Sequence, residues 1–548
     1  MKDMGKKVKW LVGALAATGL IAPALALEIS VGNNGIGARR LHEEPYNLTG
    51  SKIAIGQVEI GRPGQFGFDK VVSWNPKMSV AGIFQQDLPA SSNENVDNHA
   101  SMVAMVMVSG DKRFRGVAPG ARLYASAVGS LAESGQPEEC LSAQHVAEQN
   151  SGDVRAINFS FGESLERDRR KDAVLDGNAL LTQCIDWSSR VHDVLYVIAG
   201  NQGGGGIPIP TDHYNGITTA YTTKREGKFV KVDFANLSAL PMGIGSRTIQ
   251  QEINVGPRRA ISLVAPGDKI SLYNLEGKVT RVSGTSFAAP HITASVALLQ
   301  EYGDRQLKNF ESNWSLDSRR HEVMKAVLLN AGDKIEDRGD GFYLGMERTT
   351  VSEKNRTWLD SDAYRDEKIP LDIELGTGHL NIFRAYQQFS AGQYSPETLV
   401  ANLGWDYNKL KAKSSVDYEL EQPLAKDSFV SISLTWDRLV ELEDLDGDEQ
   451  YDVGETFRDH GLNNLDIYLM PADEKKTKKS VCSSVSEADS VEHIFCPVPE
   501  TGYYKIRVHY REQMNESVQP YGLAWWTVPS QETMNNEENN NEEFFNPQ

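Results

Sequence analysis

The sequence predicts an α/β protein with an open parallel sheet and helices on both faces, followed by an all-β sandwich. Two observations support this fold class. Strand-like and helix-like stretches alternate between residues 51 and 332, which is typical of parallel sheets with crossover helices. After about residue 395, short strand candidates are separated by turns, which is typical of a sandwich.

The individual elements follow from the apolar pattern. Buried strands are predicted at 51–61, 121–128, 154–162 and 193–201. Helices are predicted at 99–108, around 173–190, at 286–302 and at 319–332. The sandwich strands are predicted at 428–437, 464–471, 491–498, 503–510 and 522–528. Functional sites on parallel sheets lie at the carboxyl ends of the strands, so those ends are where a site is expected.

The chain begins with the features of a secretory signal. A basic stretch precedes an apolar run from Trp10 to Ile21, and Ala24-Leu25-Ala26 offers a small-residue cleavage site. We therefore expect a signal peptide over 1–26 and a secreted or periplasmic protein. The alternative is an uncleaved membrane anchor, for which the apolar run is short.

Four further segments are expected after the signal. They are a short N-terminal segment (27–50), the α/β domain (51–392), the β-sandwich domain (396–530) and a disordered Asn/Glu-rich tail (531–548). No stretch after the signal is apolar and long enough to predict a membrane span. The formal net charge of −19 argues against nucleic acid as a partner.

Four cysteines are consistent with an oxidising compartment. Three pairings are possible, and the local one, Cys140–Cys184 with Cys482–Cys496, keeps each bridge within one predicted domain. Their spacing is not that of a zinc site.

The stretch "RVSGTSFAAPHITASVALLQ" (281–300) places a serine at the start of an apolar helix. Gly284 permits a close approach, and Pro290 falls in the first turn, where a missing N–H costs little. Ser286 would then lie at the positive end of the helix, a suitable place for a nucleophile. His291 is expected to point into the helix and to be structural.

A serine nucleophile needs a base and donors for the oxyanion. His99 opens a predicted helix, Asn201 ends the strand "LYVIAGN", and Glu59 ends the first strand. Their positions suit a base, an oxyanion donor and a carboxylate that orients the base.

Six motifs resemble those of subtilisin-like serine proteases (subtilases, peptidase family S8). "SGTSFAAPH" (283–291) resembles the nucleophile motif, and "NHASMVA" with "RGVAPGARLYA" resembles the histidine helix and the strand after it. "AINFSFG" and "VIAGNQG" resemble the substrate-binding and oxyanion strands, while "LVAPGDKI" and "GTGHLNIFRAY" match two further landmarks. The resemblance covers about residues 45–390 and implies a subtilisin-like fold.

The resemblance also implies the site residues. Ser286 would attack the scissile carbonyl, His99 would take and return the proton, and Asn201 with the Ser286 backbone N–H would hold the oxyanion. An extended polypeptide substrate would pair with Ser160, Phe161 and Gly162. No cofactor for catalysis is implied.

Two positions depart from the family pattern. Glu59 stands where the family has Asp in an Asp-x-Gly turn, so its longer arm is expected to orient the imidazole. Asp69 is the rival acid, and Asp97 is too close to His99 in the chain to reach the far ring nitrogen. Ala100-Ser101 follows the histidine where the family usually has Gly-Thr.

These departures leave alternative functions open. One is a catalytically weakened or inactive relative that uses the same groove only to bind peptides. Another is an acid-acting, sedolisin-like peptidase with a Glu–Asp pair in place of histidine, against which Asn201, rather than Asp, argues.

The stretch "DLDGDEQYDVGE" (444–455) has the spacing of a calcium loop. Carboxylates occupy positions 1, 3, 5, 9 and 12 of that pattern, namely Asp444, Asp446, Asp448, Asp452 and Glu455. A structural calcium is therefore expected, with a merely solvated acidic loop as the alternative. The region that carries this loop resembles the jelly-roll appendages of secreted proteases.

Overall fold

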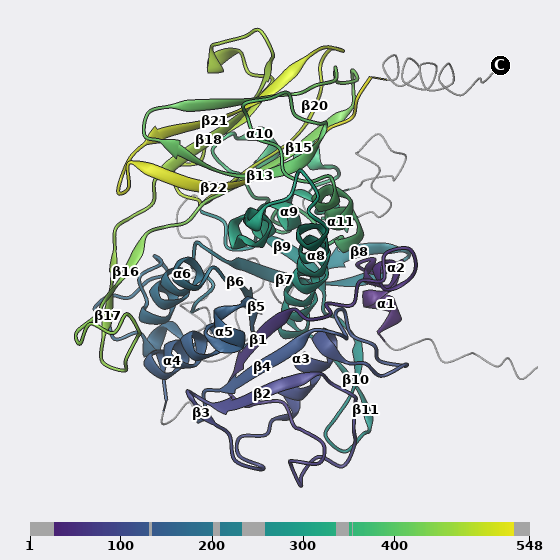
Figure 1. Ribbon diagram of the computed structural model, residues 1–548, viewed down its shortest axis with the longest axis vertical. Coiled ribbons are helices and arrows are strands. Elements are labelled where there is room, and N and C mark those ends of the chain that lie inside the picture. The colour runs from purple at the N-terminus through teal and green to yellow at the C-terminus, as the bar shows by residue number, and fades with distance from the viewer. Residues whose placement is uncertain are drawn as a thin grey trace, which may run out of the picture.

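The computed structural model describes residues 27–130, 134–200, 209–232, 258–335, 350–352 and 355–530 (Figure 1). The predicted signal segment 1–26, the predicted tail 531–548 and Asn201 lie outside these ranges. The described chain forms an α/β layer structure around a ten-stranded sheet, with two four-stranded sheets of the C-terminal region stacked beyond it.

The large sheet has the strand order β12-β8-β7-β6-β5-β1-β4-β2-β3, with β9 beside β7. Its central strands pair with one another in parallel, whereas β3 pairs antiparallel to β2 and β8 pairs antiparallel to β7. They are β1 (Ala54–Glu59), β2 (Val80–Gln85), β4 (Arg122–Ala127), β5 (Val154–Phe159), β6 (Leu195–Ala199), β7 (Ile217–Arg225) and β9 (Leu263–Pro266). Three short strands complete the edges: β3 (Leu88–Pro89), β8 (Lys228–Lys231) and β12 (Thr350–Val351).

Helices cover both faces of this sheet, as the alternation of strands and helices predicts. On β6, Leu195 and Val197 pack into the layer of α3 (Asn98–Val108) and α8 (Ala289–Asn309), whereas Tyr196 and Ile198 pack toward α4 (Gln136–Ala147) and α6 (Leu180–His192). Successive side chains of a strand point to opposite faces, so both faces are apolar and both need a helical layer. The predicted fold class is confirmed.

Further helices complete the α/β region. The longer ones are α9 (His321–Asn330) and α11 (Ile382–Ser390), and the short ones are α1 (Glu28–Val31), α2 (Ala38–His42), α5 (Gln149–Gly152) and α10 (Asp362–Arg365). The N-terminal segment belongs to the same core, because Val31 and Leu41 are fully buried in it. Glu301 Oε2 accepts the backbone N–H groups of Thr49, Gly50 and Ser51 at 2.7, 2.7 and 3.0 Å, which fixes the chain just before β1.

The C-terminal region is the expected all-β sandwich. One antiparallel sheet has the order β13-β22-β15-β20, and the other has the order β14-β21-β18-β19. The strands are β13 (Leu403–Lys411), β14 (Ser415–Glu419), β15 (Phe429–Thr435), β18 (Asn464–Pro471), β19 (Cys482–Ser484), β20 (Val491–Pro497), β21 (Tyr504–Glu512) and β22 (Val518–Trp526). Their inward side chains form a separate apolar core that includes Leu434, Ile467 and Trp525.

The sandwich is packed tightly onto the α/β region. Gly522 of β22 lies against the backbone of Glu322 at the start of α9, where a Cβ atom would come within 2.6 Å of that backbone. Thr435 Oγ1 donates a hydrogen bond to Glu322 O at 2.8 Å. A hairpin of β16 (Val440–Glu443) and β17 (Thr456–Asp459) leaves the sandwich and packs on α4 and α6 (Figure 1).

Two disulfides are present, and they follow the local pairing. Cys140–Cys184 joins α4 to α6, and Cys482–Cys496 joins β19 to β20. Among the described residues, no helix combines the length and the apolar character that crossing a membrane requires.

Candidate active site

Strand β1 and helix α3 bring a carboxylate and an imidazole together at the carboxyl edge of the sheet. Glu59 ends β1, and its Oε2 lies 2.9 Å from Nδ1 of His99 in the first turn of α3. The Glu59 side chain is 3% exposed, whereas that of His99 is 39% exposed, so the ring keeps an open side. The Glu59 carboxylate raises the pKa of His99 to about 9, against the opposing effect of burial.

Gln57 holds the Glu59 carboxylate in place. Its Nε2 donates to Glu59 Oε1 at 3.2 Å and to Ala100 O at 2.9 Å, which ties the acid to the histidine helix. Gln57 belongs to no motif. The only signal for it in the sequence is its spacing, because residues i and i+2 of a strand share a face.

The two rival carboxylates have other partners. Asp69 forms a fully buried two-bond ion pair with Arg62, with N–O distances of 2.7 and 2.8 Å, and accepts the N–H groups of Gln65 and Asn93. Although burial opposes it, these hydrogen bonds lower the pKa of Asp69. Asp97 is the N-cap of α3 and accepts the N–H of Ala100 at 2.8 Å. Neither carboxylate is hydrogen-bonded to His99, so Glu59 is the acid that the fold brings to the imidazole.

Ala100 and Ser101 follow His99 where the family usually has Gly-Thr, and the fold accommodates both side chains. Ala100 is fully buried at the first turn of α3. Ser101 Oγ donates to Asp97 O at 2.7 Å and accepts the N–H of Gly64 at 2.9 Å. The hydroxyl therefore ties the histidine helix to the loop that follows β1.

Ser286 lies in a 3-10 turn, Thr285–Phe287, immediately before α8. Gly284, with φ of +150°, allows the chain to enter this turn. Ser286 Oγ donates to Ser160 O at 3.1 Å, and Ser160 Oγ donates to Ser286 O at 3.0 Å. The ring of Phe287 lies 5.5 Å from that of His99. The residue after the serine thus lies beside the histidine, while the Ser286 hydroxyl itself is hydrogen-bonded to the end of β5.

The segment Ser160–Gly162 directly follows β5 and lines a cleft with Glu59 and His99. The cleft has a volume of about 650 Å³. Asn158 Nδ2 donates to Ser160 Oγ at 2.8 Å, so a buried amide fixes the hydroxyl that in turn holds Ser286. Asn158 lies within the motif "AINFSFG", unlike Gln57, and its i, i+2 spacing to Ser160 is the signal that places both side chains on one face of the strand.

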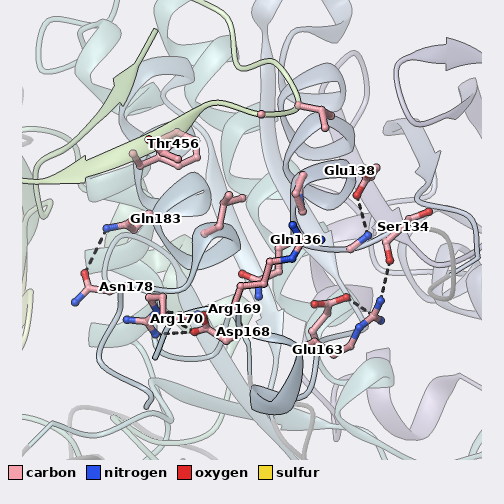
Figure 2. Close-up of a pocket in the computed structure, with 17 residues that line it drawn as sticks. Ser134, Gln136, Glu138, Glu163, Asp168, Arg169, Arg170, Asn178, Gln183 and Thr456 are labelled. Atoms are coloured by element: carbon pink, nitrogen blue, oxygen red, sulfur yellow. Dashed lines mark hydrogen bonds and ion pairs between the residues drawn. The ribbon is translucent and has the colours of Figure 1, made fainter. Parts of the chain in front are cut away.

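A second cavity, of about 740 Å³, begins where this segment ends (Figure 2). Glu163 forms an ion pair with Arg167 at 3.0 Å, and Asp168 pairs with Arg170 at 2.7 Å. Thr456, from the hairpin of the C-terminal region, lies on the opposite wall (Figure 2). The sandwich region therefore completes a cavity beside the expected substrate strand.

His291 is buried in α8 and lies outside the cleft. Its Nδ1 is 2.7 Å from Phe287 O, and burial lowers the pKa of His291 to about 4. A buried neutral imidazole bonded to the turn that precedes its own helix is structural.

The acidic loop lies between β16 and β17. Oxygens of Asp444, Asp446 and Asp448 all lie within 4.8 Å of one another. Glu455 instead accepts the N–H groups of Leu445 and Asp452 at 2.6 and 2.9 Å. The structure thus brings three of the five predicted ligands into one group, and Glu455 shapes the loop.

The loop also has the backbone of a tight turn. Asp444 accepts the N–H groups of Asp446, Gly447 and Glu449. Glu449 has a φ of +65° at the position that calcium loops usually give to glycine. The neighbouring carboxylate of Asp448 raises the pKa of Asp446.

Comparison with known proteins identifies relatives of the α/β region. The family model described as "Subtilase family" matches residues 65–346. Subtilisin Savinase of Lederbergia lenta is 23% identical over 291 residues, which are 52% of this chain and 91% of that protein. Subtilisin NAT of Bacillus subtilis subsp. natto is 27% identical over 286 residues, which are 51% of this chain and 63% of that protein. Among solved structures, prenylagaramide maturation protease PagA is 19% identical with a TM-score of 0.40, covering 64% of this chain and 97% of that one.

Proposed function

Because the chain belongs to the subtilase family, we propose that it is a serine endopeptidase that cleaves polypeptides with Ser286, His99 and Glu59. One observation carries the assignment of these residues: the 2.9 Å contact of Glu59 with His99, in a cleft shared with the segment that holds Ser286. Glu59 and Asp69 carry the same charge, so charge alone does not decide which of them orients His99. Asp69 is paired with Arg62 in a buried ion pair and does not contact His99.

The chemistry proceeds in two steps. Ser286 Oγ attacks the carbonyl carbon of the scissile bond as His99 Nε2 takes its proton. Glu59 holds the Nδ1–H and favours the imidazolium that forms, and His99 then donates the proton to the leaving amine. Water hydrolyses the Ser286 ester by the same route, with His99 again accepting and returning one proton.

The oxyanion and the peptide are held by neighbouring groups. The backbone N–H of Ser286 and the side chain of Asn201, which lies outside the described residues, are the proposed oxyanion donors. Ser160, Phe161 and Gly162 are proposed to pair with an extended substrate, because backbone groups at a strand end can add a peptide as a further strand.

Export and calcium complete the proposal. The two disulfides support an oxidising compartment, in agreement with a signal peptide over 1–26. We place a calcium ion on Asp444, Asp446 and Asp448, since oxygens of these three carboxylates lie within 4.8 Å of one another. The ion would stabilise the hairpin and takes no part in the chemistry.

Labelling with a fluorophosphonate tests the proposal. The native chain should be labelled, Ser286→Ala should not, and both should be compared with and without calcium. Ser283→Ala is the matched control, because this exposed hydroxyl in the same motif donates only to Asp268. A native chain that stays unlabelled but binds peptides would instead support the inactive relative, which the hydrogen bond of Ser286 to Ser160 favours.

A further inference from the structure

Four ionisable side chains meet where the α/β region joins the sandwich. Asp193 follows α6, His321 and Glu322 open α9, and Asp437 lies just after β15. They are outside the cleft and take no part in the proposed chemistry. His321 is 3% exposed, so the group is buried around its imidazole.

The geometry around His321 has one unusual feature. Its Nδ1 faces two carboxylate oxygens, Asp193 Oδ1 at 2.8 Å and Glu322 Oε2 at 3.3 Å. A ring nitrogen carries at most one hydrogen, so it cannot donate fully to both oxygens. Glu322 is only 6% exposed, and its Oε2 accepts no hydrogen bond. A buried carboxylate oxygen without a hydrogen bond is costly, and a bound cation would offset that cost.

We propose that Asp193, His321 and Glu322 bind one zinc ion through Oδ1, Nδ1 and Oε2. Zinc takes imidazole and carboxylate ligands at about 2.0–2.2 Å, which places tetrahedral neighbours roughly 3.3 Å apart. The separation of 3.3 Å equals that spacing, and the separation of 2.8 Å is shorter than it. One ligand atom of each of the three residues lies within 4.8 Å of the others. Water would fill the fourth position.

The surroundings of the ring match those of a metal-binding histidine. Such a histidine usually donates its other N–H to a carboxylate, which fixes the tautomer and the ring orientation. His321 Nε2 lies 3.1 Å from both oxygens of Asp437. Arg320 contacts the outer oxygen of Asp193, Oδ2, at 3.2 Å, while Oδ1 faces the ring and also accepts the backbone N–H of His321 at 3.0 Å.

The ion would join three parts of the chain. It would link the end of α6 to the start of α9 directly, and through Asp437 it would fix the sandwich to both. Asp193 is 30% exposed and offers an entry path for the metal. The role is structural and is independent of the proposed peptidase activity.

Zinc binding to the full chain tests the site. The protein is stripped with a chelator, given excess calcium to fill the acidic loop, and titrated with zinc by calorimetry and metal analysis. The wild type should take up one equivalent. Asp437→Asn should weaken binding about 10–100-fold, and His321→Gln or Glu322→Gln by more.

His460→Gln is the control, because His460 pairs with Glu441 on the β16–β17 hairpin and, among the described residues, belongs to no group of three metal ligands. It should bind zinc as the wild type does. Cobalt(II) added to the wild type gives a second readout that needs no variant, since intense visible bands report a low-coordinate site with imidazole. Absence of stoichiometric zinc uptake by the wild type, or unchanged uptake by His321→Gln, would overturn the proposal.

Discussion

Two histidines of this molecule lie beside carboxylates, one at the edge of the large sheet and one at the junction with the sandwich. His99 uses Nδ1 for Glu59 and has a side chain that is 39% exposed. His321 meets carboxylates at both ring nitrogens and is 3% exposed. A general base needs one free nitrogen that substrate can approach. The first arrangement is therefore suited to proton transfer and the second to holding elements together.

The direction of the pKa shift does not separate the two sites. The carboxylate of Glu59 raises the pKa of His99. The pKa of His321 is also raised, because the surrounding carboxylates outweigh the effect of burial. Perturbed titration thus marks both a candidate catalytic group and a structural one. The free nitrogen is what distinguishes them.

Replacing each histidine gives the largest contrast. His99→Ala should lower kcat by about 10⁶-fold, the loss typical of removing one member of a serine protease triad. The free energy of unfolding should fall by a smaller amount than in a fully buried pair, because the His99 side chain is 39% exposed and solvent screens its contact with Glu59. In EDTA, His321→Gln should instead lower the free energy of unfolding by about 3–5 kcal/mol, since buried carboxylates lose their partner. Peptide hydrolysis and urea unfolding measure the two effects, and a similar pattern in both variants would contradict the distinction.

Glu59→Gln should lower kcat by about 10⁴-fold, because an amide no longer favours the imidazole tautomer that accepts the serine proton. Glu59→Asp keeps the charge but withdraws it by one methylene, so a smaller loss, of about 10²-fold, is expected. Steady-state kinetics on a peptide substrate measure both. Full activity of Glu59→Gln would show that another group orients His99.

Asp69→Asn is the matched change at the rival acid. It leaves Arg62 as an uncompensated buried charge, so the free energy of unfolding should fall by about 3–5 kcal/mol. Because Asp69 does not contact His99, kcat of the folded fraction should be retained. A folded Asp69→Asn variant with kcat as low as that of Glu59→Gln would move the acid role to Asp69.

The contrast between these carboxylates shows what the sequence can and cannot predict. Motifs in order along the chain predict the sheet, its helical layers and the segments of Glu59, His99 and Ser286, because each motif combines a local structure with a chemical residue. They do not predict which carboxylate faces the ring. That depends on Arg62 and Gln57, whose contacts form only in three dimensions.

Other elements escaped prediction for similar physical reasons. Helix α4 carries Glu138, Glu139 and Gln144 among few large apolar residues, so its periodicity is weak. Strand β2 is only partly buried and lies near the sheet edge. The cluster around His321 joins segments more than 100 residues apart in the chain, so no local pattern marks it.

The pH dependence of activity sharpens the comparison further. Only neutral His99 can accept the serine proton, and Glu59 holds the pKa of His99 at about 9. Therefore kcat/KM should rise about tenfold per pH unit up to pH 9 and then level off. In Glu59→Gln the midpoint should move toward the ordinary value of histidine, about 6.5.

The free energy of unfolding should change with pH in the opposite direction to activity. The Glu59–His99 contact stabilises the fold fully below pH 6.5, and this contribution is lost as the pH rises through 9. Activity and stability should therefore change in opposite directions across this range. A wild-type profile with a midpoint near 6.5 would contradict the proposed influence of Glu59.

Calcium should have the smallest effect and act only through the hairpin of the sandwich. At about 100 times its dissociation constant it should add roughly 2.7 kcal/mol to the free energy of unfolding. Asp446→Asn should abolish this gain, because it removes one of three converging carboxylates.

Glu449→Gly is the matched variant: it relieves the positive φ of +65° and should strengthen calcium binding by less than about 1 kcal/mol. Neither variant should change kcat at saturating substrate, since the loop reaches α4 through Tyr451 and Gln144 and not the cleft. Equal thermal midpoints with calcium and with chelator would show that the loop is a solvated acidic turn.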